Sequence, residues 1–355
     1  MPLGRKCNRP KQKFKTKTGI ELPQILSCQS QFTEPEQMKV TEYFEKAKGN
    51  TLISFEVLPP LKGGSMKAIF DTLDPLMEFK PPFIDVTYHR EEYIYKKRPS
   101  GYYEKTAIRK RPGTVGICAA IMHRYGVDAV PHLICGGFTK EDTENALIDL
   151  NFLNINNVLA LRGDARQFEG KFIPEEDGHE YALDLVKQIE DMNKGKYLDT
   201  NIADGAKTDF CIGVAGYPEK HFEETNLDTD LYYTKAKVDA GANYIVTQMF
   251  FDNDKYFDYV KLCKKAGINV PIVPGLKPLT KKYQLSAIPR KFFVDLPEEF
   301  AKALTNAKSA EHRTEVGIEW CIHQSKELKK AGVPCLHYYT MGDSETIRRI
   351  VEKVY

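Results

Sequence analysis

The sequence predicts an α/β protein whose main part is a (β/α)8 TIM barrel, a single domain with a short N-terminal extension. Eight short apolar runs alternate with amphipathic stretches along most of the 355 residues. This order is typical of a parallel sheet covered by helices. A doubly wound open sheet is the second choice, because no GxGxxG or GxxxxGK[ST] motif follows any of the runs.

The first 37 residues are predicted to be a poorly ordered basic tail. Seven lysines and arginines lie within the first 17 residues, which contain no acid, and the segment is polar without a regular period. The formal net charge of the whole chain is only +2, so no nucleic-acid partner is expected, and an RNA-binding tail is the weaker alternative. The barrel is therefore expected to span residues 38–355, beginning with a helical pattern at Met38.

The predicted strands are short, apolar on both faces and bounded by polar, Gly or Pro residues, as parallel strands covered on both sides are. In chain order they are 51–57, 83–88, 129–134, 157–161, 210–215, 243–249, 270–274 and 335–339. The amphipathic stretches between them predict helices, among them 139–152, 179–193, 229–240, 253–267 and 310–331.

Hydropathy and cysteine spacing indicate the compartment. No apolar run approaches the 18 residues or so of a membrane span, and the N-terminus lacks the apolar centre of a secretory signal. The eight cysteines form no CxxC pair, and several lie inside apolar runs. We therefore expect free buried thiols, no metal site, no membrane partner and a cytoplasmic protein.

Polar residues stand at the ends of most predicted strands, where barrel enzymes carry their chemistry. They are Glu56, Thr87, Tyr88, His132, the turn Arg162-Gly163-Asp164, Tyr217, His221, Gln248 and Tyr339. Each has a structural explanation: Glu56 could pair with a lysine, His132 could be a satisfied core residue, and Arg162 could pair with Asp164. The joint pattern nevertheless favours one site at the mouth of the barrel.

Glu56 is the most informative of these residues. It is a lone acid in the apolar stretch ISFEVLPP, and a buried charge is costly unless it is paired or used. Burial beside Ile53, Phe55 and Val57 is expected to raise the pKa of Glu56 and keep it protonated. The chain has no HExxH, no HxH, no GxSxG and no lysine inside a strand-like run. A site without these groups suits an organic cofactor.

Seven segments carry a resemblance to a known family. ISFEVLPP, DVTY, PHLIC, LALRGD, GYPEKH, KVDAGANYIVTQMFFD and PIVPGLKP occur in this order. Together they resemble the flavin-dependent 5,10-methylenetetrahydrofolate reductases, in the bacterial-type short form without a regulatory domain. The resemblance covers residues 38–355 and implies a (β/α)8 barrel with FAD at its mouth.

The resemblance also implies an activity. It is the reduction of 5,10-methylenetetrahydrofolate to 5-methyltetrahydrofolate by NADH or NADPH, through a ping-pong hydride relay that feeds one-carbon metabolism and methionine synthesis. A homo-oligomer is implied as well. Two alternatives stay open: another flavin-dependent barrel oxidoreductase, or a barrel that binds flavin or folate without turnover.

Roles for single residues follow from the resemblance. Glu56 matches the general acid, and Asp164 matches the residue that tunes the flavin and holds the pterin. Flavin contacts are implied for Thr87, Tyr88, His132, Arg162, Gly163, Asp164, Ala182, Tyr217 and His221, with Asp230 and Lys237 near the ribose and pyrophosphate. Substrate contacts are implied for Asp164, Gln248, Gln284 and Tyr339.

The chain departs from the family pattern at three places. His89 and Arg90 follow DVTY where other members have Gly-Ala, and Arg90 could contact a phosphate or point to solvent. Asp343 replaces an arginine expected to meet the glutamate tail of the folate, a role that Lys281 or Lys282 could take over. Tyr233 and Ala236 replace polar residues that often touch FAD, so no such contact is expected from them.

Overall fold

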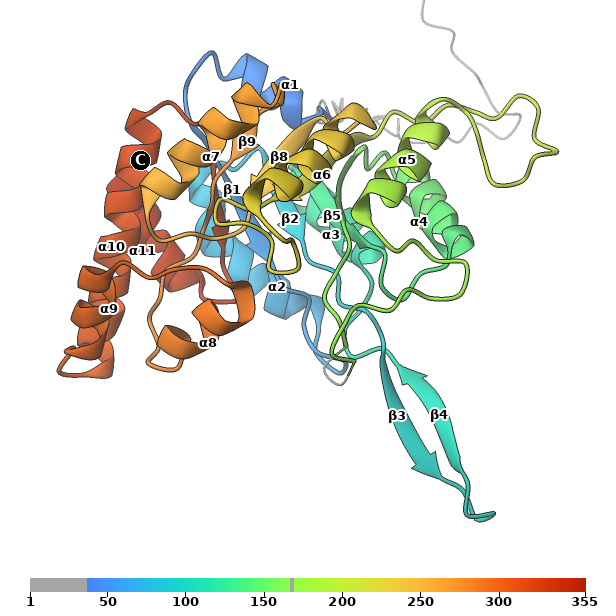
Figure 1. Cartoon of the computed structure of the whole chain (residues 1–355), viewed down its shortest axis with the longest axis horizontal. Coiled ribbons are helices and arrows are strands. Elements are labelled where there is room, and N and C mark those ends of the chain that lie inside the picture. The colour runs from blue at the N-terminus through green and yellow to red at the C-terminus, as the bar shows by residue number, and fades with distance from the viewer. Residues whose placement is uncertain (1–36, 167–168) are drawn as a thin grey trace, which may run out of the picture. The chain divides into compact units, whose positions relative to one another are not determined.

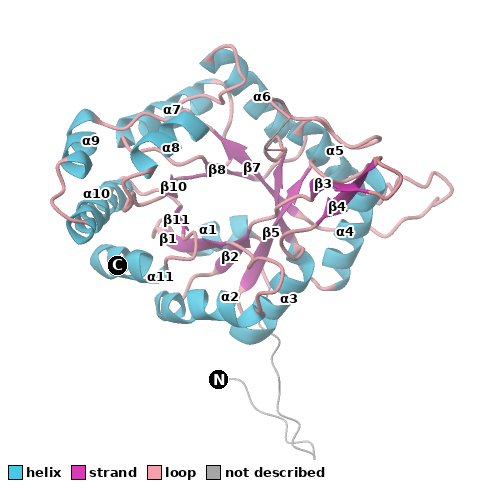
Figure 2. Ribbon diagram, turned by 90° about the horizontal axis from the view of Figure 1, so that it is seen from below, coloured by secondary structure: helices cyan, strands magenta, loops and turns pink. Residues whose placement is uncertain are grey.

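Parallel strands form a nearly closed ring in the part of the protein that the computed structural model describes, residues 37–166 and 169–355. In ring order they are β1 (Leu52–Val57), β2 (Phe83–Val86), β5 (Asp128–Ile134), β6 (Asn157–Leu161), β7 (Cys211–Gly216), β8 (Tyr244–Thr247), β9 (Ile272–Val273), β10 (Gly275–Leu276) and β11 (Cys335–Tyr339). The last strand, β11, pairs with both β1 and β10. Figure 2 looks into this ring, with helices around it.

The ring confirms the predicted (β/α)8 barrel and excludes the open sheet. β9 and β10 are two pieces of one strand, separated by Pro274, so the nine strands occupy eight positions. Proline lacks a backbone N–H and cannot donate to the ladder, which accounts for the break within the predicted strand 270–274. The predicted strand 243–249 is shorter than expected, ending at Thr247.

An outer layer of helices follows the strands (Figure 1). It consists of α2 (Met66–Leu73), the 3-10 helix η1 (Asp74–Phe79), α3 (Thr114–Tyr125), α4 (Lys140–Phe152), α5 (Ala182–Asn193), α6 (Leu227–Asp239), α7 (Asn253–Lys265), α8 (Gln284–Phe292), α9 (Glu298–Thr305), α10 (Ala310–Lys330) and α11 (Ser344–Val354). Local sequence sets their starts. Thr139, for example, accepts the N–H of Asp142, whose carboxylate accepts the N–H of Thr139 in return, a capping box that begins α4.

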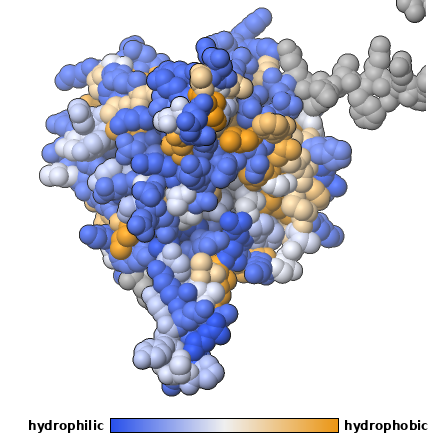
Figure 3. Space-filling model, turned by 90° about the vertical axis from the view of Figure 1, so that its right-hand side faces the viewer, coloured by the Kyte–Doolittle hydropathy of each residue, from blue (hydrophilic) through white to orange (hydrophobic). Residues whose placement is uncertain are grey.

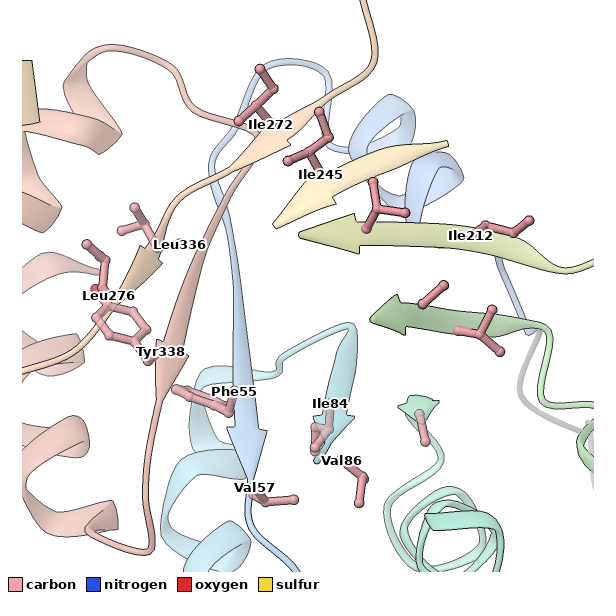
Figure 4. Packing of buried hydrophobic residues seen from close by; sticks show 14 of the residues in the cluster. Phe55, Val57, Ile84, Val86, Ile212, Ile245, Ile272, Leu276, Leu336 and Tyr338 are labelled. Atoms are coloured by element: carbon pink, nitrogen blue, oxygen red, sulfur yellow. The ribbon is translucent and has the colours of Figure 1, made fainter. Parts of the chain in front are cut away.

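The alternation of side chains along each strand separates two environments. Phe55 and Val57 on β1 and Leu336 and Tyr338 on β11 pack in the core between strands and helices (Figure 4). The intervening residues of the same strands, such as Glu56, face the inside of the barrel, because successive side chains of a strand point to opposite faces. The apolar neighbours of Glu56 in sequence are therefore not its neighbours in space.

The amino ends of the strands are covered by α1 (Val40–Lys46). Val40 is fully buried, and its N–H donates to Asn157 Oδ1 at 2.8 Å. The N–H of Met38 donates to Asp128 Oδ2 at 2.9 Å. These contacts join the start of the predicted barrel domain to β5 and β6, and they leave the opposite end of the ring as the mouth.

A two-stranded hairpin projects from the body after β2 (Figure 1). It consists of β3 (Glu92–Lys97) and β4 (Tyr103–Ile108), which pair antiparallel. Its surface is mostly hydrophilic, as the lower part of Figure 3 shows. The hairpin is absent from the predicted strands, because β3 and β4 carry Lys, Glu and Tyr in place of an apolar run.

Six cysteines are free and buried, as predicted: Cys118, Cys135, Cys211, Cys263, Cys321 and Cys335. Burial raises the pKa of each thiol. Cys7, Cys28 and the predicted basic tail lie outside the described residues, apart from Gln37. Within residues 37–166 and 169–355, no helix is both long and apolar enough to span a membrane.

Candidate active site

Four ionisable side chains meet inside the barrel near its mouth, and we call them the inner cluster: Glu56 on β1, Asp85 on β2, His132 on β5 and His337 on β11. The strand register brings them together. β1 lies between β2 and β11, with Glu56 beside Asp85 on one side and Tyr339 on the other. The exposed fractions are 12% for the Glu56 side chain, 6% for His132 and 1% each for Asp85 and His337.

Each imidazole of the inner cluster lies between the two carboxylates. His132 Nε2 is 3.7 Å from Glu56 Oε2 and 3.7 Å from Asp85 Oδ1. His337 Nε2 is 4.0 Å from Glu56 Oε2, and its Nδ1 is 3.8 Å from Asp85 Oδ2. Ser54 Oγ is 2.8 Å from His337 Nδ1. The arrangement can share and move protons among four groups.

The prediction of a raised pKa for Glu56 is wrong in this structure. Burial raises the pKa of Glu56, but the nearby imidazole of His337 and the charges of His132 and Lys277 together hold it below its usual value. The prediction failed because the apolar residues beside Glu56 in sequence face the helices, whereas its spatial neighbours come from other strands. For His337, burial lowers the pKa, but Asp85 and Glu56 hold it above the usual value.

Lys277 and Tyr339 line the mouth next to the inner cluster. Lys277 follows β10 and is 9% exposed, and burial lowers its pKa to about 8 although Glu56 opposes the shift. The Tyr339 hydroxyl donates to the Thr247 carbonyl at 2.6 Å, and its ring lies 5.2 Å from that of His337. Tyr339 thus has both the packing role first considered for it and a place beside the cluster.

A second group lies on the β6, β7 and α6 side of the mouth, and we call it the rim cluster: Arg162, Tyr217, His221, Asp230 and Lys237. The rings of Tyr217 and His221 are 4.7 Å apart. The His221 N–H donates to Asp230 Oδ2 at 3.2 Å, and Lys237 Nζ donates to the Ala215 carbonyl at 2.8 Å.

Burial in the rim cluster disfavours the charged forms of its ionisable side chains. Burial raises the pKa of Asp230 to about 6 and lowers the pKa of Lys237 to about 8. Burial and the charge of Arg162 lower the pKa of His221 to about 4. Such perturbed groups concentrate at functional sites.

Arg162 and Asp164 do not pair with each other, which removes the structural explanation first considered for them. Arg162 pairs with Glu223, whereas Asp164 Oδ2 lies 3.4 Å from Lys291 Nζ with 80% of its side chain exposed. Gly163 separates them with a φ of +83°, and a Cβ there would lie 3.3 Å from Ile134. The left-handed backbone and the close approach both favour glycine.

The remaining predicted residues occupy varied places. Thr87 donates its N–H to the Val57 carbonyl at 3.1 Å, and Ala182 is the first residue of α5. Gln248 Oε1 accepts the Met249 N–H at 3.0 Å. Gln284 Oε1 accepts the N–H groups of Thr280 and Lys281 at 2.9 and 2.8 Å. Both glutamines therefore use their amide oxygen on backbone groups.

Tyr88 is not brought together with either cluster. Its ring lies 5.0 Å from that of Phe138. It lines a separate cavity of about 410 Å³ with Arg109 and Asp142. The flavin contact implied for Tyr88 stays a prediction.

The structure explains two of the departures from the family pattern. Arg90 does not point to solvent: its side chain is 7% exposed and pairs with Glu169 at 2.8 Å. Asp343 caps α11, accepting the N–H of Thr346 at 3.1 Å and its hydroxyl at 2.8 Å. An acid suits this position because carboxylates stabilise helix N-termini.

The sequence motifs assign no role to Asp85, His337 and Lys277. A signal was available for the first two: each is a polar residue inside an apolar strand, FIDV and CLHYY, like Glu56 in its own strand. Lys277 follows the short strand β10, inside the segment PIVPGLKP, which implied no role for it. In the described part of the chain, no group of three or more His, Cys, Asp or Glu residues is placed to hold a metal ion.

The fold and the site define a (β/α)8-barrel protein with an acid–base cluster inside its mouth. Comparison with known proteins shows to which family of barrel proteins the chain belongs. The sequence model of the family "Methylenetetrahydrofolate reductase" matches residues 39–355. The chain therefore belongs to the methylenetetrahydrofolate reductase family, as the sequence motifs indicated.

Several relatives share this region. Methylenetetrahydrofolate reductase (NADH) 1 of Arabidopsis thaliana is 32% identical over 317 residues, which cover 86% of this chain and 49% of that protein. The 5,10-methylenetetrahydrofolate reductase of Escherichia coli strain K12 is 32% identical over 301 residues, 84% of this chain and 89% of that protein. The chain thus spans about half the length of its plant and yeast relatives.

A solved structure supports the fold. It is an uncharacterized protein from Clostridium thermocellum that binds two copies of 5-methyl-5,6,7,8-tetrahydrofolic acid. The TM-score is 0.51 at 12% sequence identity, and the match covers 88% of this chain and 98% of that one.

Proposed function

We propose that the protein is an FAD-dependent methylenetetrahydrofolate reductase that reduces 5,10-methylenetetrahydrofolate to 5-methyltetrahydrofolate with NADH or NADPH. Family membership and the names of the relatives support the reaction. The observation that carries the proposal is the inner cluster, which places Glu56 among proton-holding groups at the mouth of the barrel. The folate bound by the Clostridium thermocellum protein gives weaker support, because only the fold is shared.

The rim cluster fits a flavin dinucleotide. Arg162 lies near Tyr217 and His221, and Lys237 lies near His221. Such cations are the groups that bind a diphosphate. Asp230 is only 4% exposed, and burial of a carboxylate is costly unless it accepts hydrogen bonds. A ribose hydroxyl would donate such a bond and offset this cost. FAD, when bound, would accept a hydride from the nicotinamide and pass it to the folate in a ping-pong order.

Glu56 has the task of proton transfer. The five-membered ring of the substrate must open before its methylene carbon can accept a hydride, and opening requires a proton on the departing amine nitrogen. Glu56 would give that proton, and Asp164 would hold the pterin and influence the flavin through its charge. We assign Gln248, Gln284 and Tyr339 to the folate, and Thr87, His132, Gly163, Ala182 and His221 to the flavin.

Three broader properties belong to the same proposal. We propose a cytoplasmic location, a homo-oligomeric assembly and a role in one-carbon metabolism that supports methionine synthesis. A different flavin-dependent barrel oxidoreductase and a non-catalytic flavin- or folate-binding barrel are the competing functions, and the experiment below separates them.

The test follows the flavin spectrum of the purified full-length protein. We expect a yellow protein whose flavin absorbance bleaches anaerobically on addition of NADH or NADPH and returns on addition of methylenetetrahydrofolate, with 5-methyltetrahydrofolate as product. Bleaching without reoxidation by the folate would support the other oxidoreductase, and binding without bleaching would support the non-catalytic barrel. A colourless protein that cannot be reconstituted with FAD would contradict the proposal.

A further inference from the structure

We propose that His337 is a positioning residue that stores the proton delivered by Glu56, and that Asp85 and Ser54 hold it for this task. The inference rests on the proposed function, because it takes Glu56 as the general acid. It assigns roles to three residues inside the barrel that the sequence motifs left without one.

The geometry aims His337 at Glu56. Ser54 Oγ, 2.8 Å from His337 Nδ1, fixes the plane of the ring. The opposite nitrogen, Nε2, then faces Glu56 Oε2 at 4.0 Å. A shift of about 1 Å would bring these two atoms within hydrogen-bond range. His337 is 1% exposed, so its direct exchange with bulk water is restricted and Glu56 is a nearby acceptor for its proton.

Asp85 supplies the charge that keeps a proton on His337. Asp85 is 1% exposed, and neither of its carboxylate oxygens has a hydrogen-bond partner among the residues that the structure describes. A buried carboxylate without partners is costly. The nearest balancing groups are the imidazoles of His132 and His337, at 3.7 and 3.8 Å. Asp85 is therefore best balanced when a positive charge resides on these rings.

Other groups around the cluster also bear on its charge. They are Lys277 after β10, His89 after β2, Tyr339 on β11, Tyr244 on β8, Cys118 on α3 and Cys335 on β11. Burial raises the pKa of the two tyrosines and the two thiols, which keeps them neutral. Lys277, His89, His132 and His337 are the groups that can carry positive charge beside Glu56 and Asp85.

The proposed transfer is balanced in protons and needs no electrons. The N–H bond at His337 Nε2 breaks and an O–H bond forms at Glu56 Oε2, which converts an ion pair into a neutral imidazole and a neutral carboxylic acid. Glu56 then gives this proton to the folate amine nitrogen as the carbon–nitrogen bond opens. Between turnovers His337 regains a proton from solvent through Glu56, whose side chain is 12% exposed. In this way a carboxyl group whose pKa is held low can still act as an acid.

The main test measures the two half-reactions of the FAD-loaded full-length protein by anaerobic stopped flow. For His337→Asn we expect flavin reduction by NADH or NADPH to stay within about twofold of wild type. Reoxidation by methylenetetrahydrofolate should fall by about 100-fold, the lower range for loss of general acid–base catalysis. The matched control is His323→Asn, the same change on the exposed side of α10, which should alter neither rate.

The pH profile of the folate half-reaction gives a readout that a purely structural role would not move. In the wild type, the rate should fall at high pH as His337 loses its proton, and this limb should disappear in His337→Asn. Asp85→Asn provides a second variant in case the first does not fold. It should shift the same limb to lower pH by about one unit or more, the usual effect of removing a nearby opposite charge.

Two results would overturn the inference: a wild-type folate half-reaction and pH profile in His337→Asn, or an unshifted limb in Asp85→Asn. Failure of the proposed function looks different. If Glu56→Gln also turned folate over normally, the general acid itself would be misassigned. If Glu56→Gln lost the folate half-reaction while both cluster variants kept it, only the role of His337 would be refuted.

Discussion

The inner cluster and the rim cluster differ in how their charges are held. The inner residues stand on strands, at positions fixed by the sheet register, and they balance one another at 3.7–4.0 Å inside the barrel. On the rim side the charged groups stand on turns and on α6, and some pair with surface residues: Arg162 with Glu223 and Asp164 with Lys291.

This difference separates two tasks. Exposed ion pairs typically contribute only about 0–1 kcal/mol to stability, so a ligand can replace the exposed partner of Asp164 at little cost. The pair of Arg162 with Glu223 is partly buried, and a ligand that replaces Glu223 must bring a negative charge of its own. A buried cluster cannot exchange partners so easily, since each lost partner leaves an uncompensated charge. We therefore expect the inner cluster to be set for proton chemistry and the rim cluster to be adaptable to a ligand.

The largest effect should come from Glu56→Gln. The amide keeps the shape of the side chain but cannot donate an acidic proton. The folate half-reaction should therefore slow by about 10²–10⁴-fold, with flavin reduction by the nicotinamide unchanged. Stopped-flow absorbance of the flavin measures both steps. Folate turnover near the wild-type rate would show that Glu56 is not the acid.

Gly275→Ala should be the most damaging structural change near the inner cluster. A Cβ at Gly275 would lie 2.3 Å from both the Thr247 carbonyl and Tyr339 Oη, so backbone and ring must shift. We expect a loss of about 2–4 kcal/mol in the free energy of unfolding, measured by urea denaturation. Gly116→Ala is the matched control, because nothing lies within 4 Å of a Cβ there; in helix α3 it should stabilise the protein by up to about 1 kcal/mol.

On the rim, Asp230→Asn should stabilise the protein while weakening FAD binding. Burial raises the pKa of Asp230 to about 6, so folding disfavours its charged form. The destabilisation caused by the buried charge is complete at pH values above this pKa. It vanishes below about pH 4, where the carboxyl is protonated in both the folded and the unfolded state. The variant should gain on the order of 1–2 kcal/mol at pH 8, and the gain should shrink as the pH falls from 6 to 4. A gain that does not depend on pH would contradict this origin.

The smallest structural effect is expected for Asp164→Asn. Its ion pair with Lys291 is exposed, so the free energy of unfolding should change by less than about 0.5 kcal/mol. Removal of its charge should nevertheless alter both half-reactions by about tenfold, equivalent to 1.4 kcal/mol. A change in stability with both rates unchanged would show that the role of Asp164 is structural.

Much of the fold could be predicted because burial on both faces leaves a readable pattern. The run NVLAL of β6, for example, is apolar throughout and was predicted with its observed bounds. The hairpin escaped prediction because its strands, such as YEKTAI of β4, are largely exposed and carry charges. Apolar patterning reports contact with a core, which these strands lack.

The site was predictable in position and less so in chemistry. The residue at each strand end follows from sequence, so Glu56 and His132 could be placed at the mouth. The pKa of Glu56 could not be derived, because its direction depends on His337 and Lys277, which come from strands more than 200 residues away along the chain. Long-range register decides such contacts, and no local pattern records it.

The six buried thiols can report local opening of the barrel. They stand on α3, after β5, on β7, on α7, on α10 and on β11, which places them around much of the ring. Alkylation requires both access and a thiolate, and burial denies each of them both. The alkylation rate of every cysteine, resolved by mass spectrometry, would then measure how often its own element opens. Such a map could be recorded without and with each substrate, and no label would have to be engineered into the protein.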